Sequence, residues 1–244
     1  MPGTYLEHAP PAHLAPYVEC FWTLEAAEDL ADYPVLPDGC VDIVYSRGRA
    51  GNEPQVVGAM TRARKFALSA GQFDCGVRFR PGMSPLFLRV PGTETTDQSI
   101  PIGDLGGARG RRLSPQLAEA SSPEQCIRLL EQLLDHPAKP GVVQRACASI
   151  VENRGLVRVD ELASDAGLSD RQLRRLFLEQ TGLTPKHLCR VIRFRHSVSR
   201  LRRSRRGDFA QVALECGYYD QAHFINEFRE LSGYSPGEFS SLAR

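Results

Sequence analysis

Short runs of aromatic and β-branched residues, in part alternating with polar ones, occupy the first eighty residues of the chain. Such runs are typical of strands, and frequent Pro and Gly residues separate them. Pro37-Asp38-Gly39 is a turn signal before one run, and Pro81-Gly82 ends another. The pattern predicts strands at residues 17–24, 41–45, 55–58 and 76–80. A small barrel or sandwich is the architecture that these strands favour.

From about residue 84 the apolar positions follow helical spacing. Ser84-Pro85 predicts the start of a short helix that runs to Val90. Ser122-Pro123 supplies an N-cap and a first helical residue, so a second helix is expected at about 123–135. Its apolar stripe consists of Ile127, Leu130, Leu133 and Leu134. That stripe either packs within the chain or forms a contact between two copies of it.

The last hundred residues contain one helical unit twice. Of the five spacings between its marker residues, four are identical in the two copies, and the turn differs by one residue. The markers are Leu162-Ala163, Gly167, Leu173, Phe177, Gly182 and Pro185 in the first copy, and Val212-Ala213, Gly217, Phe224, Phe228, Gly233 and Pro236 in the second. Two copies are too few for a solenoid.

The repeated unit has the features of a helix-turn-helix. A short helix ends at a small Ala, and a Gly follows that suits a sharp left-handed turn. Ser169 and Asp220 are then candidate N-caps for a second helix, which carries apolar residues on one face and polar residues on the other. In a helix-turn-helix this second helix lies in the major groove of DNA.

Composition and charge narrow the class of protein. The chain has 244 residues with 42% apolar and 24% charged residues, which are ordinary globular values that suit two domains. The net charge is +1, but residues 1–140 carry −4 (13 Lys+Arg, 17 Asp+Glu) and residues 141–244 carry +5 (17 Lys+Arg, 12 Asp+Glu). Eight arginines between Arg190 and Arg206 have no acidic residue among them. This run is either a solvated helix face or a phosphate-binding surface.

Several other classes find no support in the sequence. No apolar run approaches the ~20 residues of a membrane span, and the first residues resemble no secretory signal. The seven cysteines form no CxxC pair, which favours reduced thiols in a cytoplasm. There is no GxSxG, phosphate-binding or dinucleotide motif, so no enzyme activity and no cofactor is expected.

The C-terminal hundred residues resemble the DNA-binding domain of AraC/XylS-type transcription regulators. The resemblance rests on residues 213–229, on Gly233 to Phe239, and on Leu168-Ser169 with Arg174-Arg175-Leu176-Phe177 in the first unit. Tyr218 stands where the family usually has Phe, and Asn226 where a longer polar or basic residue is common. Leu36 to Asp42 and Gly76 to Gly82 resemble an uncharacterised sensor-type domain that precedes such DNA-binding domains.

The resemblance implies an α+β chain of two domains. Residues 1–140 would form a small β-barrel-like (cupin-like) sensor or dimerisation domain with flanking helices. Residues 141–244 would form an all-α domain with helix-turn-helix units at 159–182 and 209–233, joined by a long helix at 185–201. The implied function is sequence-specific regulation of transcription in the cytoplasm. The resemblance also implies response to a small-molecule effector, activation rather than repression, and RNA polymerase and a second copy of the chain as partners.

Candidate DNA contacts follow from the residues that face away from each apolar stripe. Arg171 and Arg174 are expected to read guanine, and Arg175 to contact a base or a phosphate. Gln221 and Asn226 are expected to read adenine, with His223 on a base or a phosphate. The remaining candidates are Arg193 and Arg229, with Arg202, Arg203, Arg205 and Arg206 as further phosphate contacts.

The N-terminal half offers two open questions. Cys20, Cys40 and Cys75 are either buried apolar cysteines or a thiol or metal sensor, and the second reading opens an alternative function as a DNA-repair methyl acceptor. Asp38 and Asp42 either pair with Arg78 or Arg80 or bind a ligand. No His-x-His metal site is present, so no metal is expected.

Overall fold

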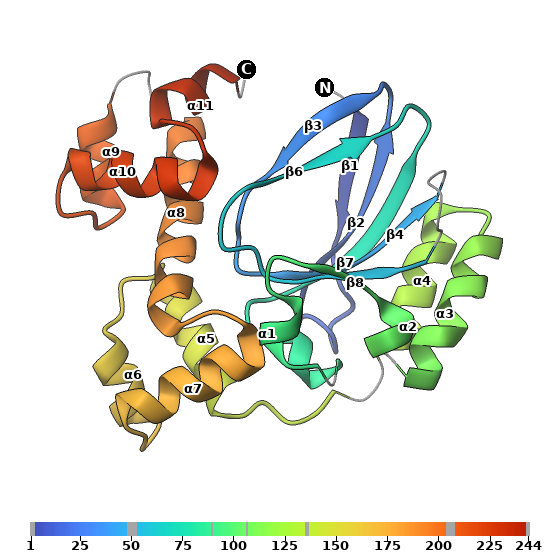
Figure 1. The fold of residues 1–244 in the computed structure, drawn as a ribbon, viewed down its shortest axis with the longest axis horizontal. Helices are drawn as coiled ribbons and strands as arrows, with labels where there is room; N and C mark the ends of the chain where they lie inside the picture. Colours follow the sequence, from blue (N-terminus) through green and yellow to red (C-terminus); the bar gives the residue numbers. More distant parts are fainter. Residues whose placement is uncertain are drawn as a thin grey trace.

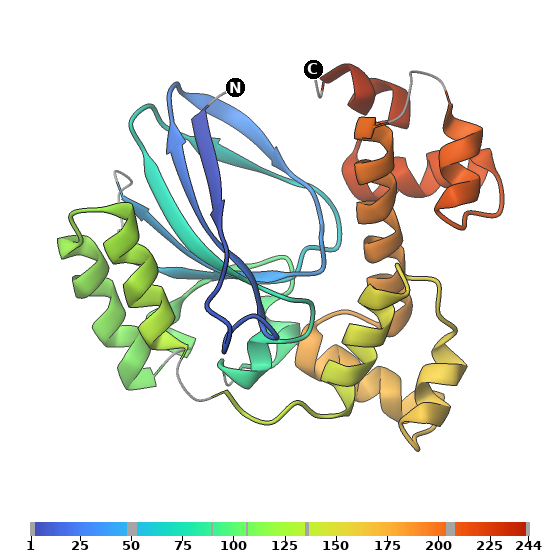
Figure 2. The same ribbon diagram turned by 180° about the vertical axis from the view of Figure 1, so that it is seen from behind.

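The structure is a computed structural model that describes residues 3–47, 53–88, 90–105, 107–134, 137–203 and 208–242. Strands dominate its first half and helices its second half, as the α+β prediction required (Figure 1). We call residues 3–134 the sheet part and residues 137–242 the helical part. The two lie side by side, with the helical part along one flank of the sheet (Figures 1 and 2).

The main sheet has six antiparallel strands in the order β1-β2-β7-β4-β5-β8. Four of them match the predicted strands, and β1 and β8 at the two edges were not predicted. Their bounds are β1 (Gly3–His8), β2 (Val18–Ala26), β4 (Val41–Arg47), β5 (Gln55–Val57), β7 (Phe73–Phe79) and β8 (Ser99–Pro101). Strands β3 (Leu30–Val35) and β6 (Arg64–Leu68) form a separate two-stranded ribbon.

The two faces of the main sheet are covered differently. The ribbon of β3 and β6 packs over one face on Cys20, Trp22 and Leu24, which gives the barrel-like form that the sequence predicted. Helix α4 (Pro123–Leu133) packs against β7 on the other face, with α3 (Gly107–Glu119) beside it. Cys126 and Leu130 of α4 are fully buried there, so its predicted apolar stripe packs within the chain.

The segment between sheet and helices is less regular than predicted. Instead of a helix at 84–90 there is a single 3-10 turn, η1 (Ser84–Leu86). The short helices α1 (Gly92–Thr95) and α2 (Ile102–Leu105) follow. Pro81-Gly82 and Pro91-Gly92 confine this segment, and neither dipeptide favours continuation of a helix.

The helical part reproduces the predicted sequence of helices. The linking helix α8 (Pro185–Arg203) begins at the predicted residue and is two residues longer than predicted. The first helix-turn-helix unit is α6 (Val159–Asp165) with α7 (Asp170–Thr181), and the second is α9 (Phe209–Glu215) with α10 (Gln221–Ser232). Helix α5 (Val142–Glu152) precedes the first unit, and α11 (Pro236–Leu242) follows the second.

Two large hydrophobic clusters hold these layers together. One is continuous from Phe21 and Phe79 of the sheet, through Cys147 of α5, to Phe177 of α7. The other surrounds α8, α9 and α10 and contains Phe194, Phe224 and Phe228. The first helix-turn-helix unit thus shares its core with the sheet part. The division into folding domains at residue 140 remains a prediction.

Candidate nucleic-acid interface

The first unit is shaped by local hydrogen bonds. Gly167 adopts a φ of +65°, which turns the chain between α6 and α7. Ser169 caps α7, and the Oε1 atom of Gln172 accepts the Ser169 N–H at 2.9 Å in return. Leu173 and Phe177 are fully buried. The opposite face of α7 exposes all three predicted contacts, Arg171, Arg174 and Arg175.

The second unit repeats this construction. Gly217 has a φ of +72°, and the Oδ1 atom of Asp220 accepts the His223 N–H at 2.7 Å, which caps α10. Phe224 and Phe228 are fully buried. The predicted contacts Gln221, His223, Asn226 and Arg229 are all exposed on this helix.

A further pair of equivalent residues escaped the sequence analysis. The hydroxyl of Thr181 at the end of α7 is 2.8 Å from the Phe177 carbonyl oxygen, to which it donates. The hydroxyl of Ser232 at the end of α10 donates to the Phe228 carbonyl at 2.6 Å. Both side chains are buried. The signal in the sequence was a hydroxyl residue before Gly182 and before Gly233.

Arg193 has a structural role that differs from the predicted one. Its Nη2 atom lies 2.7 Å from the Oε1 atom of Glu227, whose side chain is only 4% exposed. The Arg193 guanidinium also lies over the Tyr218 ring, 4.7 Å from the ring centroid. Arg190 contacts the same carboxylate at 2.9 Å. These contacts direct Arg193 into the packing between α8 and α10, and its contact with DNA stays a prediction.

Part of the arginine run is paired with acidic residues of the same chain. Acidic partners come from other elements of the fold: Glu227 and Glu230 pair with Arg190, Glu19 with Arg195, and Glu215 with Arg200. Arg202 and Arg203 at the end of α8 are exposed. Arg205 and Arg206 lie outside the described residues.

Tyr219 is an exposed residue at the interface that the sequence analysis did not select. It immediately precedes the cap of α10, and 92% of it is exposed. Its N–H donates to the Nδ1 atom of His223 at 3.4 Å. The His223 Nε2 atom lies 3.8 Å from the Glu227 carboxylate. The exposed start of α10 therefore combines a phenol, an imidazole and the amide of Gln221.

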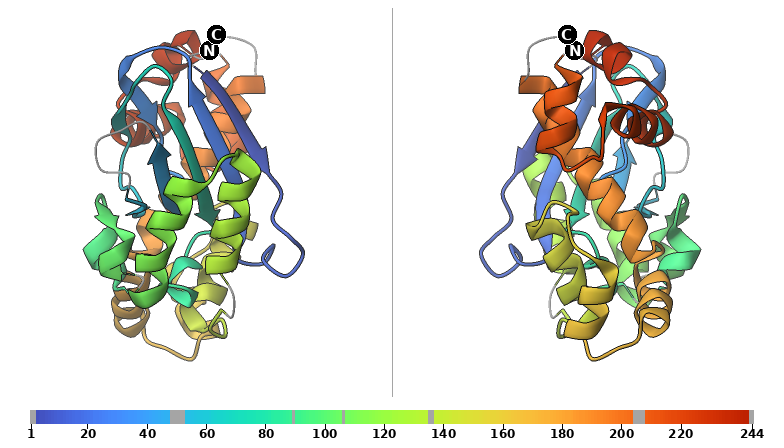
Figure 3. Two further views of the ribbon diagram at one scale, coloured as in Figure 1. Left: turned by 90° about the vertical axis from the view of Figure 1, so that its right-hand side faces the viewer. Right: turned by 90° about the vertical axis from the view of Figure 1, so that its left-hand side faces the viewer.

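The sheet part contacts the same end of both recognition helices (Figures 1 and 3). At the end of α7, Gly92 of α1 approaches so closely that a Cβ atom on it would lie 2.1 Å from the Gly182 nitrogen. At the end of α10, the Ala63 N–H donates to the Leu231 carbonyl at 2.7 Å. Gly182 and Leu231 lie in corresponding C-terminal turns of the two units. The N-terminal turns, which carry most of the predicted base contacts, remain exposed.

Cys20, Cys40 and Cys75, the three cysteines that the sequence singled out, do not form one cluster. Cys75 belongs to the face of the sheet that packs on α4, whereas Cys20 lies on the opposite face under the ribbon. Burial raises the pKa of Cys20 to about 12, and burial followed by the nearby Asp38 carboxylate raises that of Cys40 well above its usual range. Across the described residues, no three His, Cys, Asp or Glu side chains are arranged to hold a metal ion. This arrangement gives no support to the methyl-acceptor alternative.

Asp38 and Asp42, the candidate ligand-binding aspartates of the sheet part, pair with Arg78. Arg78 lies 3.1 Å from Asp42 and 3.5 Å from Asp38, which confirms the ion-pair interpretation of these aspartates. Arg80 instead donates to the Ala15 carbonyl at 2.9 Å.

None of the helices within the described ranges combines the length and the apolar character that crossing a membrane would take.

Comparison with known proteins agrees with this geometry. Residues 162–241 match a family described as "Helix-turn-helix domain", and residues 6–101 match one described as "Domain of unknown function (DUF6597)". Together with the regulators that the chain resembles, these matches support a DNA-binding transcription regulator of the AraC type.

The relatives are full-length regulators that extend beyond the matched segments. The transcriptional activator RhaR of Klebsiella pneumoniae is 30% identical over 119 residues, which are 48% of this chain and 36% of that protein. The transcriptional regulator GlxA of Rhizobium meliloti is 29% identical over 181 residues, which are 72% of this chain and 51% of that protein. The chain thus spans about half or less of the length of these relatives.

Among solved structures, ToxT of Vibrio cholerae matches 98% of this chain with 97% of its own length. The two are 12% identical, and the TM-score is 0.41.

Proposed function

We propose that this protein recognises a specific duplex DNA sequence with α7 and α10, placed in successive major grooves on one face of the double helix. The observation that carries the proposal is the equivalence of the two helices. Both expose their capped N-terminal turns, and the sheet part contacts both at the C-terminal turn. Successive major grooves are ~34 Å apart. If α8 is rigid, either the two recognition helices are separated by this same distance or the DNA bends to meet both of them.

Each exposed side chain has a defined part in this proposal. Arg171 and Arg174 donate two hydrogen bonds each to guanine O6 and N7, and Gln221 and Asn226 pair with adenine N6 and N7. Arg175, His223 and Arg229 contact a base or a phosphate. The exposed hydroxyl of Tyr219 and the guanidinium groups of Arg202 and Arg203 donate to phosphates.

The sheet part supplies regulation in the same proposal. Because it touches both recognition helices, any change in its packing alters their relative positions. A small-molecule effector that shifts this packing would therefore control DNA binding. The relatives named RhaR are described as activators, which supports activation as the outcome. The proposal adds RNA polymerase as a partner and a second copy of the chain on an adjacent half-site.

The test is selection of binding sites from a random duplex library, followed by footprinting of the selected sequence. Wild type is compared with Arg174→Ala, Gln221→Ala and the control Arg128→Ala, which alters an exposed arginine on α4. Each interface variant should lose about 1–3 kcal/mol of discrimination at one base position while the control binds like wild type. Equal binding by all four proteins would refute the two-helix readout.

A further inference from the structure

The turn that follows α5, residues 153–158, is held closed by its own backbone. The Gly155 N–H donates to the Ile150 carbonyl at 2.8 Å, and the Arg154 N–H donates to the Val151 carbonyl at 3.0 Å. This pair of hydrogen bonds is a Schellman motif, in which the residue after the helix cap adopts a left-handed conformation. Arg154 does so, with a φ of +55°. We call this compact segment the α5–α6 turn.

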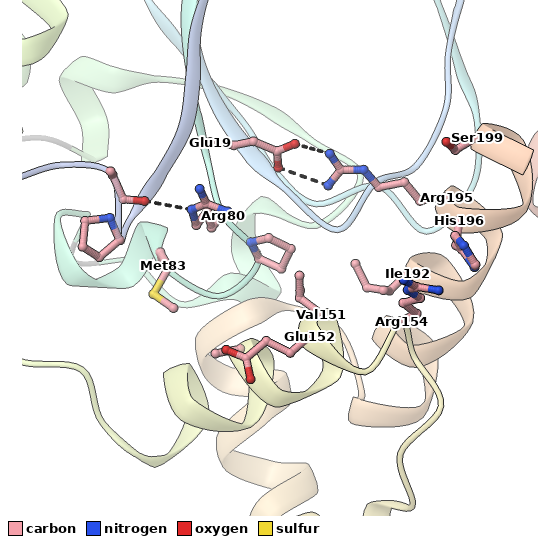
Figure 4. A pocket seen from close by; sticks show the side chains of 14 residues that line it. Glu19, Arg80, Met83, Val151, Glu152, Arg154, Ile192, Arg195, His196 and Ser199 are labelled. Atoms are coloured by element: carbon pink, nitrogen blue, oxygen red, sulfur yellow. Dashed lines mark hydrogen bonds and ion pairs between the residues drawn. The ribbon is translucent and has the colours of Figure 1, made fainter. Parts of the chain in front are cut away.

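The α5–α6 turn packs directly on the backbone of α8. A Cβ atom on Gly155 would lie 2.2 Å from the Cys189 carbonyl oxygen and 3.1 Å from the Arg193 nitrogen, so this position requires glycine. Figure 4 shows the side chain of Arg154 beside Ile192 of the same helix. The turn therefore has a fixed place on the helix that joins the two helix-turn-helix units.

Leu156 of this turn reaches the second helix-turn-helix unit. A Cβ atom on Gly217 would lie 2.5 Å from the Leu156 Cδ2 atom and 3.2 Å from its Cδ1 atom, so the leucine side chain rests on the bare backbone of that glycine. Gly217 is the residue that turns the chain between α9 and α10. Val157, the next residue of the turn, packs against the hydrophobic cluster that contains the first unit. The α5–α6 turn thus connects the two units directly, alongside α8.

The first unit has no such contact at the equivalent position. Gly167 has a φ of +65° and Gly217 a φ of +72°, and each turns the chain between the two helices of its unit. Around Gly167, no atom of a described residue beyond its chain neighbours lies within 4 Å of the place that a Cβ atom would take. Both turns need glycine for their backbone, but only at Gly217 does another side chain use the space that glycine leaves. The contact with Leu156 is therefore a feature of the packing and not of the repeated motif.

Leu156 acts close to the exposed end of the second recognition helix. Gly217 lies shortly before Asp220, which caps the N-terminal turn of α10. Two further contacts lie further along the helix: Glu227 in its middle pairs with arginines of α8, and Leu231 near its end accepts a hydrogen bond from the sheet part. A change at Gly217 therefore tilts α10 at its N-terminal turn, which carries most of the predicted base contacts.

We propose that Leu156 is a positioning residue for DNA recognition. By resting on Gly217 it sets the place of the N-terminal turn of α10 relative to α7, and with it the spacing that the protein accepts between the two DNA segments that these helices contact. This inference rests on the proposed function, in which both helices read one duplex. One inserted base pair moves the second segment by about 3.4 Å and rotates it by about 34°. A protein that holds α10 in place rejects such a site, and a protein without this contact adjusts to it.

The placement of α10 is tested first without DNA. Nitroxide labels on the exposed positions Glu179→Cys of α7 and Ala222→Cys of α10 report the distance between the two helices in electron–electron double resonance. The seven native cysteines are buried and stay unlabelled in the folded protein. Leu156→Ala should broaden or shift the distribution of this distance. The control Leu6→Ala removes a leucine of β1 that is 53% exposed, against 52% for Leu156, and should leave the distribution unchanged. The same distribution in all three proteins would overturn the proposal.

The spacing preference is tested on the site selected from the random library, with one base pair inserted between the segments that α7 and α10 protect. Wild type and Leu6→Ala should bind the altered site at least about tenfold more weakly than the selected one. Leu156→Ala should lose no more than about threefold, because α10 is free to follow the displaced segment. A wild-type ratio of the two affinities in folded Leu156→Ala would overturn the proposal. The spin-label distances involve no DNA, so failure of every protein to select a site refutes the proposed function and leaves the placement of α10 to be decided by those distances.

Two glycine variants separate the contact from backbone strain. Gly217→Ala adds a Cβ atom that displaces the Leu156 side chain, so its spacing ratio should match that of Leu156→Ala, and combining the two substitutions should add nothing further. Gly167→Ala is the matched control, since it strains an equivalent left-handed turn but meets no side chain. It should keep the wild-type spacing ratio even where the strain lowers its stability. Equal spacing ratios in the two glycine variants would show that strain, and not the contact with Leu156, is responsible.

Discussion

Arg195 of α8 donates two hydrogen bonds to the carboxylate of Glu19 on β2, 176 residues earlier in the chain. This pair joins the main sheet to the helix that connects both helix-turn-helix units. Glu19 also lies 3.5 Å from the Cys40 thiol, and its side chain is 23% exposed. The pair is thus a direct polar link between the part proposed to sense and the part proposed to bind DNA.

Glu19 should make stability depend on pH. Burial raises its pKa, but the hydrogen bonds and charge of Arg195 outweigh this effect and hold the pKa below its usual value. The stabilisation is therefore present above the unfolded-state pKa of about 4.3 and is lost as the pH falls through the lower folded-state pKa. Glu19→Gln should lower the free energy of unfolding by about 1–2 kcal/mol at pH 7. In urea titrations this difference from wild type should shrink towards pH 3, and a constant difference would contradict the assignment.

Glu227 should be far more important for stability than its neighbour Glu230. Glu227 is buried and accepts hydrogen bonds from Arg190 and Arg193, so Glu227→Gln leaves two arginines short of their counter-charge. A loss of about 3 kcal/mol in unfolding free energy is expected. Glu230→Gln alters a 63% exposed carboxylate and should cost less than about 1 kcal/mol. Equal effects in denaturant titrations would show that the buried pair has no special role.

Gly92 lies so close to Gly182 that a side chain at residue 92 should destabilise the protein. A Cβ atom at residue 92 would meet backbone atoms of Thr181 and Gly182, which have little freedom to move. Gly92→Ala should lower the free energy of unfolding by about 1–3 kcal/mol and loosen the contact between α1 and α7. Faster amide hydrogen exchange at the end of α7 would show this directly.

Gly237→Ala is the matched control for that substitution. The nearest atom to its added Cβ is 3.8 Å away, and residue 237 lies within helix α11. Alanine is the better helix former, so this variant should be as stable as wild type or more stable by up to about 1 kcal/mol. If both glycine variants behave alike, the contact at Gly92 is looser than the structure shows.

Arg202 should contribute to DNA affinity without contributing to sequence preference. Its side chain is exposed at the end of α8, so it suits a phosphate rather than a base edge. Arg202→Gln should weaken binding to specific and random duplexes alike. The slope of log affinity against log salt should fall by about 0.9. Arg111→Gln on the exposed face of α3 is the control, and an unchanged slope in both variants would remove Arg202 from the interface.

Local sequence patterns were sufficient to predict most of the helices and turns of the helical part. The spacing of Gly167, Ser169 and Phe177, repeated at Gly217, Asp220 and Phe228, predicted both helix-turn-helix units and their capped helices. These features are readable because turns, caps and apolar stripes depend on residues within a few positions of one another. The exposed faces of α7 and α10 followed from the same spacing.

Such local patterns could not predict contacts between residues that lie far apart in the sequence. The arginines of α8 appeared unpaired because Glu19, Glu215, Glu227 and Glu230 lie far from them or on other helices. The edge strands β1 and β8 carry weak local signals, since their pairing with β2 and β5 rather than their own residues defines them as strands.

The order of residues along the chain was thus enough to establish two recognition helices, their caps, the helix between them and the side chains that they expose. Only the folded structure decided which arginines of α8 are paired, which faces of the sheet hold Cys20 and Cys75, and that Arg195 pairs with Glu19. The physical reason is that a helix is stabilised by neighbours three and four residues away. An ion pair, a shared core or a cavity is formed by residues that only the packing of distant elements brings into contact.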